Sequence, residues 1–257
     1  LLPRVLTNQT LILLPTMLLT QFTSLCFTPD PPHLSRTRFL LSLLAMATGH
    51  DIVQYLTHRY LLHSPRIPLI RALKHAIHHS TGASRGLSAC YMSGPDFFLE
   101  IVLPYLVPLA AIGGGGADPC FHYLVAALGA IGGVYEHSGY DFALLISSPP
   151  PPPPSSVSST QTSPPEEGKE SPPDEKEKHN IWSTLADTLL NNRAHGEHHA
   201  RTNVSFSDGF GSPGVCDSLF GTRWDLVPRR RGEGRGTEWA LAEKEWRVQR
   251  ERLVDSR

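Results

Sequence analysis

Histidines in this 257-residue chain gather in four short groups, and two of the groups share the spacing HxxHH. Histidine is the commonest metal ligand among side chains. In a helix, positions i, i+3 and i+4 share one face, so each HxxHH group predicts one patch of imidazoles. One tetrahedral zinc cannot use all the grouped histidines, so their number predicts two metal ions. The grouped residues are His58 and His63, then His75, His78 and His79, then His137, and finally His195, His198 and His199.

The first group has a different spacing from the others. His58 and His63 are five residues apart, which a regular α-helix does not place on one face. Either the two rings serve different metals across a pocket, or the helix is distorted locally. Imidazole suits iron, zinc and copper. The four cysteines are scattered and predict neither disulfides nor a thiolate site, so iron that activates oxygen and zinc both fit the ligands.

Four apolar stretches are predicted to position these groups, at residues 6–27, 39–56, 97–117 and 121–135. The last two are separated by 113–119 and predict a membrane hairpin, which leaves the histidine groups before and after it on one membrane face. An excess of Arg and Lys over residues 57–96 predicts that this face is cytosolic. A signal peptide is the alternative for the first stretch, and a buried soluble hairpin is the alternative for the last two.

The remaining segments are polar. Residues 147–178 are rich in proline and serine and then charged, which predicts a disordered insert, with a PxxP docking segment as the alternative. Net charge is −1 and gives no sign of a nucleic-acid partner. The predicted organisation is an N-terminal membrane segment and connector at 1–38, hydroxylase-like parts carrying the histidine groups at 39–146 and 179–228, the insert at 147–178, and a basic amphipathic tail at 229–257.

The order of the motifs resembles the fatty acid hydroxylase / sterol desaturase superfamily. The resemblance is carried by DIVQYLTHRYLLH, KHAIHH, EHSGYDF, HGEHH and SLFGTRWD, and it runs from about Asp51 to Asp225 without the insert. Any one motif is weak, but the combination is highly specific. EHSGYDF and the late FGT are most similar to the C-4 methylsterol oxidase branch. The string SGPDFFLE departs from the family, because many relatives have a His-Pro pair there.

The resemblance implies an all-α, integral membrane helical bundle of about four spans, with a cytosolic helical cap that carries a histidine-rich dimetal site. It implies multi-pass residence in the endoplasmic reticulum membrane and two iron ions as cofactors, with zinc possible in the isolated protein. Asp51 matches an acidic position ahead of the first histidine group, where its carboxylate would orient a ligating imidazole. By motif match, the implied metal ligands are His58, His63, His75, His78, His79, His137, His195, His198 and His199.

The implied activity is that of an O2-dependent monooxygenase in lipid or sterol biosynthesis. It would hydroxylate or oxidise a C–H bond of a sterol or related lipid taken from the bilayer. The sequence has no flavin, nicotinamide or haem fingerprint, so the family implies electrons from cytochrome b5 and its NADH-dependent reductase. A fatty acid or sphingoid-base hydroxylase is the alternative within the superfamily. A non-catalytic membrane protein that holds zinc is the alternative from another class.

Overall fold

The computed structural model describes residues 1–23, 35–63, 73–112, 119–143, 190, 192–207 and 212–228. Every regular element within these ranges is a helix, which agrees with the all-α prediction for the part of the chain that is described. The predicted insert at 147–178 and the predicted tail at 229–257 lie outside the described residues.

The N-terminal helix is continuous through three elements, α1 (Leu2–Asn8), the π-helical η1 (Gln9–Leu13) and α2 (Leu14–Phe22). Its buried anchor is polar, because the side-chain amide of Asn8 donates to the carbonyls of Cys90 and Met92 at 3.1 and 3.0 Å. Its outward face is apolar, with Leu11 71% and Phe22 83% exposed. An exposed apolar face of this kind is typical of a surface that contacts a membrane or another protein.

Within the described residues, two helical runs are long and apolar enough to cross a membrane. The first joins α3 (Arg36–Leu56) to the π-helical η2 (Thr57–Leu62). The second joins α6 (Gly94–Phe97), the π-helical η4 (Phe98–Val102) and α7 (Leu103–Ile112). Only 22% and 39% of their apolar windows are buried inside the protein, as expected of helices that face lipid. They coincide with two of the four predicted apolar stretches, and the number of four spans stays a prediction.

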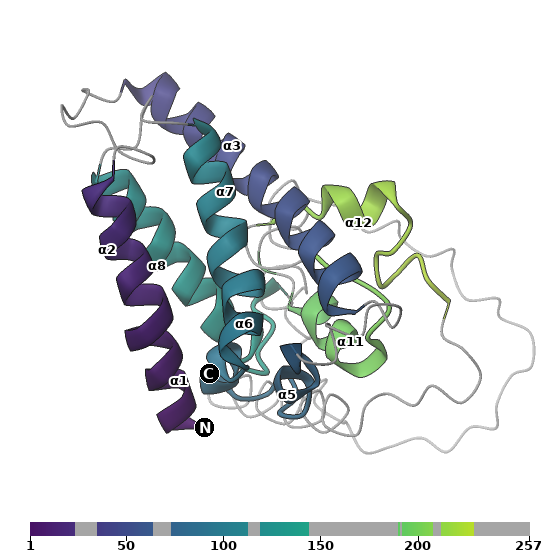
Figure 1. Ribbon diagram of the computed structural model, residues 1–257. Coiled ribbons are helices and arrows are strands. Elements are labelled where there is room, and N and C mark those ends of the chain that lie inside the picture. The colour runs from purple at the N-terminus through teal and green to yellow at the C-terminus, as the bar shows by residue number, and fades with distance from the viewer. Residues whose placement is uncertain are drawn as a thin grey trace, which may run out of the picture.

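Helices α3 and α7 pack closely side by side (Figure 1). A Cβ atom on Gly49 would lie 2.4 Å from Cβ of Pro108, so the glycine allows the two helices to approach. Met46, Leu109 and Phe121 form a core cluster that joins α3 and α7 to α8 (Pro119–Glu136). Helix α8 returns toward the end of the bundle at which α3 finishes (Figure 1), so the residue after it, His137, reaches the other histidine groups.

Four short helices complete the described structure: α5 (Ala76–His79), the 3-10 helix η3 (Gly86–Cys90), α11 (Arg193–Arg201) and α12 (Val215–Leu219). Helices α5 and α11 lie beside the end of the bundle where α3 finishes and α6 begins (Figure 1). A second core group, made of Tyr55, Phe206 and Cys216, ties this region to α3. The histidine groups before and after the α7–α8 hairpin therefore meet at one end of the molecule, as predicted.

Candidate metal centre

The nine predicted ligands come together in two adjacent clusters. In each cluster the potential ligand atoms all lie within 4.8 Å of one another. The clusters adjoin, since the ring centroids of His79 and His199 are 4.6 Å apart. The first cluster contains His58, His63, His75, His79 and His198, and the second contains His78, His137, His195 and His199.

In the first cluster the Nε2 atoms converge on one point. Nε2 of His63 lies 3.1 Å from that of His75 and 3.2 Å from that of His79. Nε2 of His198 is 3.1 Å from Nε2 of His63, and Nε2 of His58 is 3.2 Å from Nε2 of His75. Nitrogens that bind one ion at ~2.0–2.1 Å must lie roughly 3 Å from each other. The spacing therefore suits five ligands of a single metal.

The second cluster has the same geometry with four imidazoles. Nε2 of His137 lies 3.3 Å from that of His78 and 3.0 Å from that of His195. Nε2 of His199 is 3.1 Å from Nε2 of His195. This set of four nitrogens can hold a second ion.

Backbone carbonyls fix the orientation of several rings. Nδ1 of His58 lies 2.8 Å from the carbonyl of Phe206, and Nδ1 of His198 lies 2.7 Å from the carbonyl of Val204. A carbonyl only accepts, so Nδ1 must donate, and the proton sits there rather than on Nε2. The Nε2 lone pairs of these two rings then point into the first cluster, in the neutral form in which imidazole binds a metal ion. The donor set therefore fits bound metal ions.

Each HxxHH group is divided between the two clusters. In the group 75–79, the i and i+4 residues, His75 and His79, join the first cluster, while the i+3 residue, His78, joins the second. The group 195–199 is divided in the opposite sense, because only its i+3 residue, His198, joins the first cluster. At about 100° per residue, position i+3 turns away from i on the side opposite to i+4, so one turn can serve two sites. Each group forms one imidazole patch, as expected, with the ring centroids of His75, His78 and His79 4.7–5.9 Å apart, and each patch is shared by the two clusters.

A π-turn brings His58 and His63 together. The amide of His63 donates to the carbonyl of His58 at 2.9 Å, an i→i+5 bond that closes η2. The wider turn places residues five apart on one face, and the two ring centroids are 4.9 Å apart. Of the two alternatives from the sequence, local distortion of the helix is therefore correct, and the two rings belong to one cluster rather than to different metals.

Burial keeps most of these imidazoles neutral. It lowers the pKa of His78 to about 3 and the pKa of His198 to about 4. Burial, together with the nearby imidazoles of His198 and His75, lowers the pKa of His63 to about 2. Neutral imidazole is the form that binds metal. His75 is the exception, because burial lowers its pKa but the carboxylates of Glu100 and Asp96 outweigh that effect and raise it to about 10.

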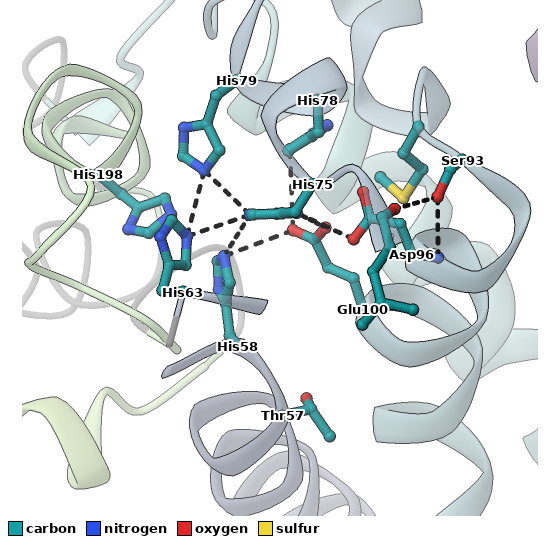
Figure 2. A network of polar contacts seen from close by, with 12 residues as sticks. Thr57, His58, His63, His75, His78, His79, Ser93, Asp96, Glu100 and His198 are labelled. Atoms are coloured by element: carbon teal, nitrogen blue, oxygen red, sulfur yellow. Dashed lines mark hydrogen bonds and ion pairs between the residues drawn. The ribbon is translucent and has the colours of Figure 1, made fainter. Parts of the chain in front are cut away.

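Two buried carboxylates beside His75 were not identified from the sequence. Oδ1 of Asp96 lies 2.9 Å from Nδ1 of His75, and Oε2 of Glu100 lies 3.3 Å from the same nitrogen (Figure 2). A carboxylate on Nδ1 orients a ligating ring and makes it more basic. The available signal was a pair of acids four residues apart within an apolar stretch, where ionisable residues are rare and functional.

Asp51 was predicted to orient an imidazole directly, but in the structure it binds the chain segment that in turn contacts an imidazole. Its buried carboxylate accepts from the hydroxyl of Ser207 at 2.6 Å and from the backbone amides of Val215 and Cys216 at 2.6 and 3.3 Å. These bonds hold the chain next to Phe206, whose carbonyl contacts His58. Asp51 thus supports the segment that orients a ring, and its hydrogen bonds do not go to the ring itself.

Comparison with known proteins agrees with this site. The model of the fatty acid hydroxylase family matches residues 43–162. This range contains the histidine group of His58 and His63, the group of His75, His78 and His79, and His137. Neither the curated proteins nor the solved structures include a match to the chain. Members of this family are membrane hydroxylases and desaturases, which suits the two apolar helical runs and the histidine-rich centre. Over residues 43–162 the chain is therefore similar to the fatty acid hydroxylase family, and the two histidine clusters lie partly within this matched region.

Proposed function

We propose that this chain is a membrane-bound di-iron oxygenase that hydroxylates a C–H bond of a sterol, using O2 and electrons from cytochrome b5. The observation that carries the proposal is the division of nine imidazoles into two adjacent clusters of five and four. Two ions held next to one another, at the end of helices that suit a bilayer, are appropriate for oxidising a lipid.

The ligand set favours iron over structural zinc. A structural zinc site is almost always closed by four ligands in a tetrahedron. The first cluster offers five imidazole nitrogens, and Cys90 and Cys216, the cysteines whose side chains the structure describes, belong to neither cluster. More than four nitrogen ligands without thiolate suit a redox metal of higher coordination number.

Bound iron would supply the activation of dioxygen. The overall reaction is R–H + O2 + 2 electrons + 2 H⁺ → R–OH + H2O, so one oxygen atom enters the lipid and the other leaves as water. The electrons must come from a partner, for which cytochrome b5 and its NADH-dependent reductase are proposed. The protein's own part is to hold the rings and to exclude water. His58, His78 and His198 are 3% exposed or less, and the carbonyls of Phe206 and Val204 fix two of these rings.

The proposed substrate and location follow from the surroundings of the site. The strings EHSGYDF and FGT are most similar to the C-4 methylsterol oxidase branch, which supports a sterol. Outward-facing side chains such as Leu41 and Leu44 would contact lipid, from which the substrate would enter. The basic residues Arg59, Lys74 and Arg85 near the clusters support a cytosolic site on the endoplasmic reticulum membrane.

The test is expression in a yeast that lacks its own C-4 methylsterol oxidase and is fed the sterol it needs. The chain is compared with His78→Ala and His198→Ala, which remove one ligand from each cluster. His122→Ala is the matched control, since His122 is a buried histidine outside both clusters. Sterols are profiled at equal protein levels.

The proposal expects 4-methyl sterols to fall with the native chain and with His122→Ala, and to accumulate with either ligand variant. An unchanged sterol profile together with a new hydroxylated acyl chain or sphingoid base would show that the substrate is not a sterol, while the oxygenase activity would stand. No change in any lipid from a chain that binds zinc rather than iron would reject the oxygenase.

A further inference from the structure

Helix α12 and the residues that follow it carry an exposed apolar surface. Val215 is 48% exposed, Leu219 74%, Phe220 51% and Leu226 57%. We call residues 215–226 the α12 segment. An apolar patch gathered on one short segment is typical of a surface that contacts a membrane or another protein.

The α12 segment packs on the second half of α3 (Figure 1). The amide of Val215 donates to Asp51 at 2.6 Å, and the ring of Phe220 stacks on Tyr55 with centroids 5.1 Å apart. Leu56, the next residue of α3, is itself 48% exposed. The apolar surface of the α12 segment is therefore continuous with the outward face of a helix that suits a bilayer.

The position of these contacts along α3 gives the depth of the segment. At ~1.5 Å per residue, the run from Arg38 to Arg59 is roughly 30 Å long, which is the thickness of the hydrocarbon core of a bilayer. On the same rise, Asp51 and Tyr55 lie roughly 12 and 6 Å before Arg59. Amphipathic elements on a membrane surface bury their apolar side chains to roughly 5–10 Å. The α12 segment thus lies at the level of the acyl chains, close to one surface.

The hydrogen bonds of the segment suit apolar surroundings. The amides of Val215 and Cys216, in the first turn of α12, donate to the carboxylate of Asp51. The amide of Phe220 donates to the carbonyl of Cys216 at 2.9 Å, and the hydroxyl of the exposed Ser218 donates to a backbone carbonyl at 2.8 Å. Polar groups of a chain in contact with lipid need such partners within the protein.

We infer that the α12 segment is a membrane-inserted element, with the side chains of Leu219 and Phe220 among the acyl chains of the leaflet on the histidine side. Its depth along α3 and its continuity with the outward face of that helix favour lipid over a second protein chain as the occupant. Arg223 and Asp225, which follow the apolar residues, form a pair at 2.6 Å and lie toward the headgroups.

Insertion of this segment would fix the height of the metal centre. The carboxylate of Asp51 joins the start of α12 to Ser207, and the neighbouring Phe206 contacts His58 through its carbonyl. The inserted side chains are therefore linked to the first cluster through a few hydrogen bonds. A lipid that reaches the clusters from this leaflet would then have only a short way to travel.

The experiment uses the full chain in phosphatidylcholine nanodiscs that hold one copy each. Three variants are treated with a charged maleimide that does not enter the bilayer. Leu219→Cys tests the segment, Leu44→Cys on the outward face of α3 is the lipid reference, and Arg85→Cys at an exposed charged residue is the aqueous reference. Labelling of the unsubstituted chain, which has four cysteines, is subtracted. Because a thiol in apolar surroundings ionises poorly, we expect Leu219→Cys to react roughly tenfold more slowly than Arg85→Cys.

A second readout identifies what covers residue 219. The variants are labelled with bimane in detergent and then placed in nanodiscs whose lipids carry brominated acyl chains. We expect the bromine to quench bimane at positions 219 and 44 and to leave bimane at position 85 bright.

Reaction of Leu219→Cys at the rate of Arg85→Cys would place the segment in water and overturn the inference. Slow reaction without quenching would show that protein covers the residue, and protection found only in discs with two chains would show that a second copy does. Either result overturns the inference. Should Leu44→Cys react as fast as Arg85→Cys, the proposed membrane location fails together with it. A negative sterol profile with Leu219→Cys still protected would reject the proposed substrate and leave the inference standing.

Discussion

The imidazoles of His78 and His79, neighbours in the chain, face different clusters. Nε2 of His78 lies 3.3 Å from that of His137, and Nε2 of His79 lies 3.2 Å from that of His63. The short helix α5 is therefore a wall shared by the two sites. A change in its position would affect both ions, whereas replacing a single ring should affect one cluster first.

This division predicts complementary losses of metal. The double variant His63→Ala/His79→Ala removes two ligands from the first cluster, and we expect about one iron per chain, held in the second. His78→Ala/His137→Ala should likewise leave about one iron, held in the first. Iron counting and the distinct Mössbauer signal of each remaining ion would check the assignment. Identical residual signals from the two variants would contradict it.

The π-turn of η2 predicts an asymmetric tolerance to changes in length. Deleting the partly exposed Leu61 leaves His58 and His63 at i and i+4, which share a face of a regular α-helix. We expect this variant to keep two irons. Inserting one alanine at the same place turns His63 by about 100° and should remove the iron of the first cluster. Metal content of both purified variants is the measurement, and equal losses would show that the wider turn is not what aligns the rings.

The lowered pKa values predict that the metal-free fold weakens in acid. The pKa of His78 is about 3 and that of His198 about 4, both held down by burial, whereas an unfolded histidine titrates near 6.5. Below pH 6.5 these histidines bind protons in the unfolded chain but not in the folded chain, so the free energy of unfolding falls as the pH drops toward 4. Each such ring costs up to roughly 2 kcal/mol between pH 6.5 and 5.

His75 acts in the opposite direction. Because its pKa is about 10, His75 makes its full contribution to the free energy of unfolding below pH 6.5, and this contribution is progressively lost as the pH rises toward 10. Thermal unfolding of the metal-free chain, followed by circular dichroism, should therefore show lower stability at pH 5 than at pH 7, because more rings have lowered than raised pKa values. His198→Ala should flatten the slope between these pH values. A stability that is unchanged or higher at pH 5 would contradict the prediction.

The position of Asp51 predicts an effect confined to one cluster. Asp51→Asn weakens the bonds to Ser207 and to the start of α12, and we expect a loss of about 1–3 kcal/mol in the free energy of unfolding. The loosened segment carries the carbonyl that orients His58, so iron should be lost from the first cluster before the second. Asp225→Asn is the control, since its exposed pair with Arg223 contributes at most about 1 kcal/mol. Chemical unfolding and iron titration provide the two readouts.

The grouping of the nine histidines was predictable from the sequence, because residue type and spacing are local properties. The nine histidines fall in tight groups, and the structure brings all nine together. The apolar stretches at 39–56 and 97–117 likewise coincide with the two helical runs that suit a membrane. Such patterns need only the helical period and the hydrophobic effect to be interpreted.

Which histidine joins which cluster was decided by the tertiary structure alone. His198 contacts His63 although the two residues are 135 positions apart in the sequence, and no local pattern predicts such a pair. The same is true of Glu100, which reaches His58 and His78 only in the folded structure, and of Asp51, whose partners include Ser207 and the start of α12. Sequence spacing fixes the direction of a side chain around its own helix, whereas the point at which side chains converge depends on how the helices cross.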